Sequence, residues 1–565
     1  MKIRSNKQKK VKQEGKLGIY QWPIVIQDGK RSKLVSEIIE FTSKRYIELD
    51  NDTLESIINK SIYLEKQRIK LDPWKVDPPN EIVFWNKAKK KLDQSLLIED
   101  KSFQKEKLVQ IIQKIIKKYA EEIVGNFNID TFYFARKFLT VFFKGIFDRF
   151  SLFDFFRLPS AKKKCLSHFK VSGDYSIVKE LFNHGTVVIL PTHSSNLDSI
   201  LIGFMLDQVS DLPAFSYGAG LNLYNNSLAA FYMNRLGAYR VDRRKKNPIY
   251  LDSLKNMSSI SIEEGTNTIF FPGGTRSRDG MIETKLKLGL MGSVIDAQRS
   301  ALQQNLNNKI FIVPLVVSYD AVLEAGMLIE QHLKRTGREQ YSSQIKRKWS
   351  FFKILRFSHN LIFKKSNVYF SFGEPMDVIG NVVNKQGESI DKYGNKIDIK
   401  SYFELQGIVD SDEQRESEYT KLLGKKVGES FLKLNQILPI HLVCFTIVNL
   451  LKEKFNSQDI FDILKYPPTE WTLEYDKFIA SCNEALTMIQ AEAKQELFKI
   501  PEIMQQDLNK ILAYALQYGA IYHVLKPLKL EPKKNIVKIN DLPVVIFYHN
   551  RMVGYELEQK LKWVK

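Results

Sequence analysis

The sequence predicts an α/β domain with a mostly parallel sheet flanked by helices, preceded and followed by helical regions. Short β-rich runs alternate with helical stretches between about residues 166 and 380, and this alternation is typical of strand–helix–strand units. The chain has 565 residues, of which 44% are hydrophobic, so it is long and apolar enough to bury more than one core. This composition excludes disorder as the main state.

Five β-rich runs are the predicted strands of the α/β domain, and a helix is expected after each of the first three. The runs are Val187–Leu190, Gly237–Val241, Asn267–Phe271, Ile310–Tyr319 and Asn367–Gly373. In open parallel sheets, binding sites gather at the carboxyl ends of the strands. The loops after these strands are therefore where functional residues are expected.

Two regions precede the α/β domain, and one is expected to be disordered and the other folded. Residues 1–30 are basic and predict a disordered N-terminus, whereas residues 31–165 read as mostly helical. Within the helical part, Lys107–Phe127 has apolar residues at helical spacing. The aromatic stretch Phe132–Phe156 fits either a core helix or an interfacial amphipathic helix.

The regions after the α/β domain begin with a loop. Residues 381–400 carry the turn signals Gly387 and Gly394 and predict a long loop or an exposed hairpin. Residues 401–565 predict a mainly helical domain. Within it, Ile437–Leu451 is expected to be a buried helix and Leu542–Tyr548 a strand.

Charge and composition limit the function classes. The net charge of +21 favours polyanionic partners such as nucleic acid, anionic lipid or phosphorylated substrates, although a general abundance of lysine would give the same value. Three scattered cysteines exclude a disulfide framework, and no His/Cys/Glu spacing suggests a metal site, so no metal is expected. The longest apolar run is too short to span a bilayer, and a cytoplasmic protein is expected.

The loop after the first predicted strand contains a candidate general base. His193 and Asp198 are five residues apart in Pro191–Ser199, and they would meet if His193 lies in the loop and Asp198 in the first turn of the following helix. A carboxylate on imidazole Nδ1 fixes the tautomer and leaves Nε2 free as a base. A single His–Asp pair at this spacing also occurs by chance. The alternative interpretation is therefore that His193 is a surface histidine near a helix cap and has no catalytic role.

Basic residues follow the next two predicted strands. Arg243 lies in the loop after the second predicted strand. In the loop after the third predicted strand, Pro272, Gly273 and Gly274 allow the backbone to turn tightly and approach a ligand. Arg276 and Arg278 follow in the same loop as a pair suited to gripping a phosphate, with Lys285 and Lys287 expected at the start of the next helix.

No nucleophile motif accompanies these residues, so the predicted site is a base beside an anion clamp. Such a site suits direct attack of a substrate hydroxyl on an activated carbonyl, with a phosphate on the acceptor.

These segments, in this order, resemble the glycerolipid acyltransferase superfamily. His193 to Asp198 matches its His-x4-Asp motif, and Gly237 to Arg243 matches its Gly-x-x-x-hydrophobic-Asp-Arg motif. Phe271–Ser277, which includes Thr275, is similar to its Phe-Pro-Glu-Gly-Thr-Arg-Ser motif, with Gly273 in place of the usual Glu. Ile312–Val316, with Pro314, resembles the fourth motif.

The flanking segments are similar to the glycerol-3-phosphate and dihydroxyacetone-phosphate acyltransferase branch. The resemblance implies transfer of a fatty acyl group from acyl-CoA or acyl-carrier protein to glycerol 3-phosphate in phospholipid biosynthesis, with 1-acylglycerol 3-phosphate or dihydroxyacetone phosphate as alternative acceptors. It implies no cofactor. His193 would be the base, Asp198 its partner, and Arg276 and Arg278 the phosphate ligands, supported by Arg243 and Lys287.

Such an enzyme is expected to associate peripherally with an anionic membrane surface. The predicted docking segment is Gln331–Lys365, which is rich in basic and aromatic residues, and Phe132–Phe156 is the second candidate. The alternative of another class is a basic, non-enzymatic protein that binds nucleic acid or membranes. A pure binder needs neither His193 nor Asp198, and nucleic acid is not an expected partner.

Overall fold

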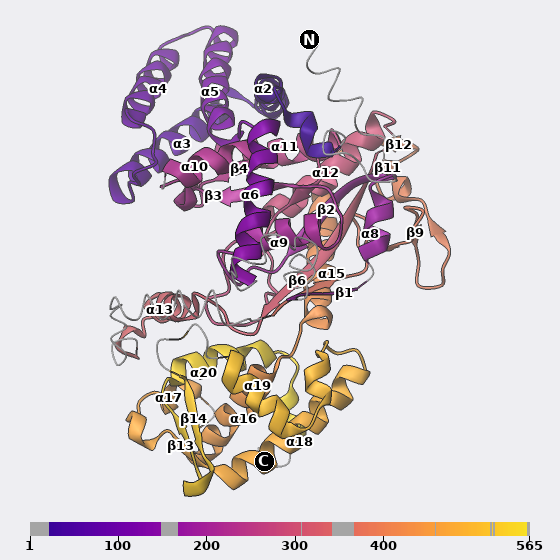
Figure 1. The fold of residues 1–565 in the computed structure, drawn as a ribbon. Helices are drawn as coiled ribbons and strands as arrows, with labels where there is room; N and C mark the ends of the chain where they lie inside the picture. Colours follow the sequence, from indigo (N-terminus) through magenta and orange to yellow (C-terminus); the bar gives the residue numbers. More distant parts are fainter. Residues whose placement is uncertain are drawn as a thin grey trace.

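The computed structural model shows an α/β centre between a helical N-terminal region and a mainly helical C-terminal region (Figure 1). The residues that it describes are 22–147, 168–173, 175–225, 227–306, 308–341, 367–457, 459–519, 523 and 526–561. The basic N-terminus up to residue 21 and most of the predicted docking segment Gln331–Lys365 lie outside these ranges.

Helices form the N-terminal region, as predicted. They are η2 (Pro23–Gln27), α2 (Arg31–Ile47), α3 (Asn51–Leu71), α4 (Glu81–Leu96), α5 (Lys101–Ile123) and α6 (Ile129–Phe147). Aspartates begin two of them: the Asp50 carboxylate accepts from the backbone N–H of Thr53, and that of Asp100 accepts from Ser102 and Phe103. The apolar stripe of α5 is buried against its neighbours.

A seven-stranded sheet forms the centre, in the order β1-β7-β6-β2-β5-β3-β4. Its strands are β1 (Phe169–Ser172), β2 (Gly185–Pro191), β3 (Ser216–Gly220), β4 (Ala238–Val241), β5 (Thr268–Ile269), β6 (Lys309–Tyr319) and β7 (Val368–Phe372). Every neighbouring pair is parallel except β6 with β7. The predicted α/β class with a mostly parallel sheet is therefore confirmed.

Helices cover this sheet and connect its strands (Figure 1). They are α8 (Tyr175–Leu181), α9 (Asp198–Gln208), η4 (Leu221–Asn225), α10 (Ser227–Arg235), α11 (Pro248–Glu263), α12 (Gly289–Gln303), α13 (Ala325–Arg335) and η5 (Glu339–Tyr341).

Two strands, β1 and β3, were not predicted. β3 has the sequence Ser-Tyr-Gly-Ala-Gly, which carries little of the apolar signal of a buried strand. It is a strand because it pairs with β4 and β5 in the sheet. The predicted strand Asn267–Phe271 is shorter than expected, with ladder pairing only at Thr268 and Ile269.

The predicted loop or hairpin at residues 381–400 is a small meander. Strands β8 (Val382–Val383), β9 (Ser389–Ile390) and β10 (Lys396–Ile397) pair antiparallel. The turns between them contain Gly387 and Gly394, with φ of +70° and +86°. After η6 (Ile399–Tyr402), β11 (Glu404–Leu405) and β12 (Ile408–Val409) form a second small hairpin.

The C-terminal region packs helices around one buried helix. Helix α15 (Glu413–Leu434) leads into it and packs on α12 and β6 of the α/β centre. The buried helix α16 (Pro439–Lys454) is contacted by α17 (Ile460–Ile463), α18 (Tyr475–Lys494), α19 (Leu508–Tyr518) and α20 (Leu542–His549). A three-stranded sheet consists of β13 (Thr472–Glu474), β14 (Leu528–Glu531) and β15 (Ile536–Ile539). The remaining 3₁₀ turns are η7 (Pro468–Glu470), η8 (Glu502–Gln505), η9 (Pro532–Lys534), η10 (Asn550–Met552) and η11 (Leu557–Lys560).

One predicted helix of this region is confirmed and one predicted strand is wrong. Helix α16 is buried along nearly its whole length, as expected for Ile437–Leu451. Leu542–Tyr548 is the helix α20 instead of a strand. The Asp541 carboxylate caps it by accepting from the backbone N–H of Val544, and Pro543 occupies its first turn. Its all-apolar sequence reflects complete burial, which suits a strand or a helix equally.

None of the helices in the described part of the chain is long and apolar enough to cross a bilayer.

Candidate active site

The loop between β2 and α9 carries the candidate base, and β6 fixes this loop. The backbone N–H of Thr192 donates to the Leu315 carbonyl at 2.9 Å, and the backbone N–H of Val317 donates to the Thr192 hydroxyl at 3.1 Å. Asp198 is the first residue of α9. The histidine therefore lies in the loop and the aspartate in the first helical turn, which is the arrangement that the sequence required for contact.

His193 and Asp198 form a direct pair. The Nδ1 atom of His193 lies 2.8 Å from Oδ2 of Asp198, whose side chain is fully buried. The same Oδ2 atom accepts from the backbone N–H groups of Ser194 at 2.7 Å and Ser195 at 2.9 Å. These donors and the N-terminus of α9 stabilise the charged form of the buried carboxylate.

Two further residues of this network were missed from the sequence. The Tyr319 hydroxyl, at the end of β6, donates to Oδ1 of Asp198. Burial and the charge of Asp198 raise the pKa of Tyr319 well above its usual value, so its hydroxyl keeps the proton that it donates. Glu324 accepts from the Ser195 hydroxyl at 2.8 Å and from the Asn196 backbone N–H at 3.0 Å.

The loop after β5 packs directly on His193. The backbone N–H of Ser277 donates to the His193 carbonyl at 2.8 Å. The Phe271 ring stacks on the imidazole, with ring centroids 4.2 Å apart and an angle of 25° between the planes. The left-handed conformation in this turn belongs to Gly274, with a φ of +73°, and not to Gly273.

Three arginines come together in this part of the molecule, as the sequence suggested. Loss of hydration, followed by the positive charges of Arg278 and Arg276, lowers the pKa of Arg243. For Arg278, burial and the charges of Arg335 and Arg276 have the same effect. Arg335 is the last residue of α13 and was expected instead in a membrane-docking segment.

Positive charge in this arginine cluster (Arg243, Arg276, Arg278 and Arg335) is poorly neutralised. Among the residues that the structure describes, Arg278 donates to two neutral groups, Gln331 Oε1 and Thr275 Oγ1, both at 3.3 Å. Nη1 of Arg276 is buried with no hydrogen-bond partner among the residues described. Mutual repulsion of this kind is relieved by an anion, so the cluster is suited to bind one.

Arg244 shows the opposite environment one residue away. Its guanidinium donates to Asp242 Oδ2 at 2.8 Å, pairs with Asp77 and lies 4.0 Å from the ring centroid of Trp74. The N-terminal helical region thus fixes the loop after β4 through Arg244. Arg243, which follows the same strand, instead lies near the positive charges of Arg276 and Arg278.

The remaining predicted residues have supporting positions. The Lys287 side chain lies over Gly274, where an added Cβ would come within 2.6 Å of it, and its backbone N–H donates to the Pro272 carbonyl at 2.7 Å. Lys285 and Lys287 precede α12, which begins at Gly289, so their predicted place at a helix start is wrong.

Gly237 and Pro314 serve packing. Gly237 has a φ of +87°, and an added Cβ would lie 2.4 Å from a methyl carbon of Ile24. Pro314 is buried in β6 opposite Leu190 of β2.

An apolar cavity of about 160 Å³ begins beside the base. Phe271, which stacks on His193, and Ser199, next to Asp198, are among its lining residues. The rest of the lining comes mainly from α6, α9, β3 and the segment before β3, with Trp22, Phe132, Ile202, Gly203, Phe204 and Phe215 prominent.

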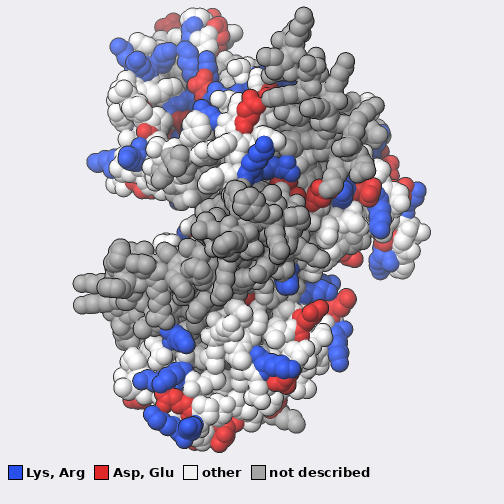
Figure 2. All heavy atoms as spheres, in the orientation of Figure 1, with Lys and Arg blue, Asp and Glu red and all other residues white. Residues whose placement is uncertain are grey.

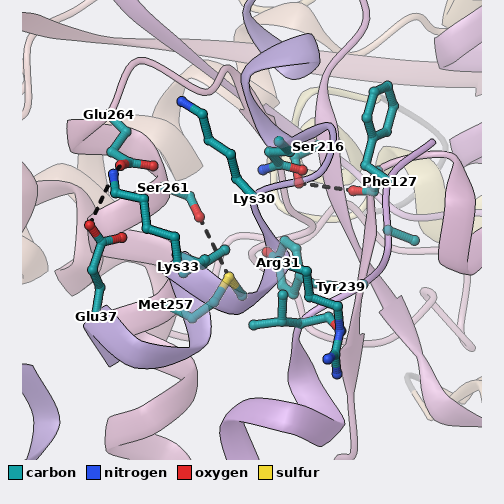
Figure 3. A pocket seen from close by; sticks show the side chains of 16 residues that line it. Lys30, Arg31, Lys33, Glu37, Phe127, Ser216, Tyr239, Met257, Ser261 and Glu264 are labelled. Carbon is teal, nitrogen blue, oxygen red and sulfur yellow. Dashed lines mark hydrogen bonds and ion pairs between the residues drawn. The ribbon is translucent and has the colours of Figure 1, made fainter. Parts of the chain in front are cut away.

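A second, smaller hollow of about 30 Å³ lies where α2 meets α11 and β4 (Figure 3). Lys33 lies there between Glu37 and Glu264, at 3.0 and 2.7 Å. Arg31 donates to the carbonyl oxygen of Glu121 at 2.8 Å, near the C-terminus of α5. The paired charges indicate a structural junction between helices, with room for about one water molecule.

The face in Figure 2 shows Lys and Arg interspersed with Asp and Glu over the described surface. Unbalanced positive charge is instead concentrated beside His193, in the arginine cluster. Within the described residues, no group of three or more His, Cys, Asp or Glu side chains is placed to hold a metal ion.

The buried network around Asp198 gives a stability prediction. Tyr319→Phe removes one donor to a buried carboxylate and should lower the unfolding free energy by about 1.5–3 kcal/mol at pH 7. Urea denaturation measures this change. Tyr393→Phe is the matched control, because Tyr393 is 76% exposed. Equal stability of the two variants would show that Tyr319 does not support Asp198.

Comparison with known proteins finds similarity to acyltransferases. Residues 168–318 match the family described as Acyltransferase. A glycerol-3-phosphate acyltransferase of Colwellia psychrerythraea is 26% identical over 227 residues, covering 40% of this chain and 26% of the relative. One from Histophilus somni is 28% identical over 200 residues, covering 35% and 22%.

A longer match extends beyond the α/β domain. The glycerol-3-phosphate acyltransferase of Shewanella sp. (strain MR-7) is 22% identical over an alignment of 565 positions, covering 92% of this chain and 63% of the relative. In each of these matches the chain spans less than two thirds of the relative's length. Residues 168–318 are thus similar to the Acyltransferase family, and the chain as a whole is similar to glycerol-3-phosphate acyltransferases.

Proposed function

We propose that this protein transfers a fatty acyl group from a thioester donor to the hydroxyl of glycerol 3-phosphate. The observation that carries the proposal is the environment of His193. Its Nδ1 atom is held by the buried Asp198 carboxylate, and Nε2 has no hydrogen-bond partner among the described residues. A histidine oriented in this way is a general base, with the arginine cluster nearby to hold the acceptor's phosphate.

The reaction follows from this orientation. His193 Nε2 takes the proton of the acceptor hydroxyl while its oxygen attacks the thioester carbonyl carbon. The imidazolium that forms is stabilised by Asp198 through Nδ1–H. The tetrahedral intermediate then collapses, the carbon–sulfur bond breaks, and the imidazolium returns its proton to the leaving thiolate. An ester and a free thiol result, and His193 is again neutral.

The apolar cavity suits the acyl chain of the donor. It begins at Phe271 and Ser199, so a chain inside it would leave the thioester carbon beside the imidazole. Burial of methylene groups in such a cavity contributes roughly 0.8 kcal/mol each. This arrangement separates the two substrates, with the chain on the apolar side of His193 and the phosphate on the basic side.

The first prediction concerns the base. His193→Ala should abolish acyl transfer, and Asp198→Asn should lower kcat by up to ~10⁴, because the imidazole loses its orientation. Transfer of labelled acyl groups from a thioester to glycerol 3-phosphate is the measurement. His184→Ala is the matched control, since His184 lies at the far end of β2, before Gly185. Near-full turnover in His193→Ala would contradict the mechanism.

The second prediction concerns the acceptor phosphate. Arg276→Ala and Arg278→Ala should each raise the KM for glycerol 3-phosphate by about one to two orders of magnitude, because each removes a charge-assisted contact worth ~1.5–3 kcal/mol. Thioester hydrolysis without acceptor should change little. If only the KM for the donor rises, these arginines bind the other substrate.

The third prediction concerns the acyl chain. Gly203 lines the cavity, and an added Cβ there has no neighbour within 4 Å, so Gly203→Leu is accommodated and narrows the space. The preferred donor chain should become shorter, whereas Gly203→Ala should keep the original preference. Competition between donors of different length measures this. An unchanged profile in Gly203→Leu would place the chain elsewhere.

A further inference from the structure

The side chain of Glu283 occupies the space beside Gly273 that any other residue there would need. An added Cβ at Gly273 would lie 2.1 Å from Oε2 and 2.5 Å from Oε1 of Glu283. These distances are far below van der Waals contact, so a side chain at 273 and the present position of Glu283 exclude each other. The glycine thus makes room for a carboxyl group from further along the same loop.

This carboxyl group lies against the loop that carries the base. It lies near the backbone of His193, and its negative neighbours are Asp198 and Asp279. Arg551, from η10 of the C-terminal region, is the positive charge that faces it. Its Oε2 atom is buried with no hydrogen-bond partner among the residues described. Because this carboxyl fills the space beside Gly273, it supports the loop whose Phe271 ring and Ser277 backbone contact His193.

We propose that Glu283 is a positioning residue of the acyl-transfer site, whose carboxyl fills the space left by Gly273 and keeps the loop after β5 in place against His193. This loop holds His193 through the Phe271 ring, which stacks on the imidazole, and through the Ser277 N–H, which donates to the His193 carbonyl. This inference rests on the proposed function and adds a residue that none of the sequence patterns contains.

The carboxyl group does this while neutral. Burial, followed by the negative charge of Asp198, raises the pKa of Glu283 to about 8, and Arg551 and the His193 backbone only partly offset this. Near pH 7 the group therefore carries a proton and does not compete with Asp198 for the imidazole. When it ionises above pH 8, a second negative charge appears next to Asp198, and the loop is expected to shift.

Glutamine imitates the neutral acid, so three substitutions separate position from charge. Glu283→Gln should keep kcat within about threefold of the unchanged protein at pH 7, and its kcat should not fall between pH 7.5 and 9, where that of the unchanged protein does. Glu283→Ala should lose about 10²-fold in kcat, because a displaced base costs that much. Glu330→Gln, on an exposed ion pair of α13, is the matched control.

Moving the glutamate from position 283 to position 273 tests whether the two side chains compete for the same space. Gly273→Glu alone should inactivate the enzyme, because its side chain meets Glu283. The double variant Gly273→Glu/Glu283→Ala should be at least tenfold more active than Gly273→Glu. Gly289→Glu is the control for adding a glutamate, since nothing lies within 4 Å of a Cβ at that position.

Two measurements test the positioning role of Glu283 independently of acyl transfer. Hydrogen exchange of residues 191–197 should speed up in Glu283→Ala and stay unchanged in Glu283→Gln. The native state holds the Glu283 proton more tightly than the unfolded state, so the stability contributed falls as pH rises from about 4.3 through 8. The urea midpoint should therefore fall less steeply with pH in Glu283→Gln than in the unchanged protein.

The outcomes distinguish the two proposals. If the unchanged protein transfers no acyl group while exchange and urea midpoints behave as described, the proposed reaction is wrong and the placement of Glu283 stands. If Glu283→Gln loses as much kcat and protection as Glu283→Ala, or if both variants behave like the unchanged protein, Glu283 does not position His193.

Discussion

The burial of one charged carboxylate, Asp198, determines how this site is built. An ionised carboxylate removed from water is costly unless hydrogen-bond donors surround it. Here the donors come from the His193 ring, the backbone of the β2–α9 loop and the Tyr319 hydroxyl at the end of β6. Strand β6, the loop and the start of α9 must all be in place for the carboxylate to be stable, so the folded sheet and the orientation of the imidazole depend on each other.

Neighbouring arginines have opposite environments, and this difference makes the site positively charged. Arg244 is neutralised by Asp242 and Asp77, and it anchors the N-terminal helices to the sheet. Arg243, Arg276 and Arg278 lie close enough to lower each other's pKa. Repulsion between these arginines raises the free energy of the protein when no anion is bound, and an anionic substrate relieves it. The net charge of the chain alone would not have located this concentration of positive charge.

Much of the α/β centre could be predicted from the sequence, because its strands are buried apolar runs followed by loops with Gly, Pro and charged residues. The meeting of His193 and Asp198 followed from placing one in a loop and the other in a helical turn. The helix Leu542–His549 could not be told from a strand, because it is apolar on every side. Tyr319 and Glu283 could not be found at all, since their roles depend on contacts between distant or folded-back segments.

The interdependence of the three regions explains why a match confined to residues 168–318 describes only part of the site. The C-terminal region contributes Arg551, which donates to the Val317 carbonyl and the Ser318 hydroxyl on β6. Burial lowers the pKa of this arginine to about 10, and the nearby acidic groups Glu283 and Asp198 partly offset that effect. Its positive charge therefore lies close to Asp198 and to the carboxyl group of Glu283.

The central claim is that His193 acts between a phosphate site and an acyl site. The most direct measurement compares acyl transfer from one labelled long-chain thioester to glycerol 3-phosphate and to glycerol, using the purified 565-residue chain. Transfer to glycerol 3-phosphate at a kcat/KM at least a hundredfold above that for glycerol is the predicted result, since in the proposed site the arginine cluster holds the phosphate. Equal transfer to both acceptors, or transfer to neither, would contradict the account.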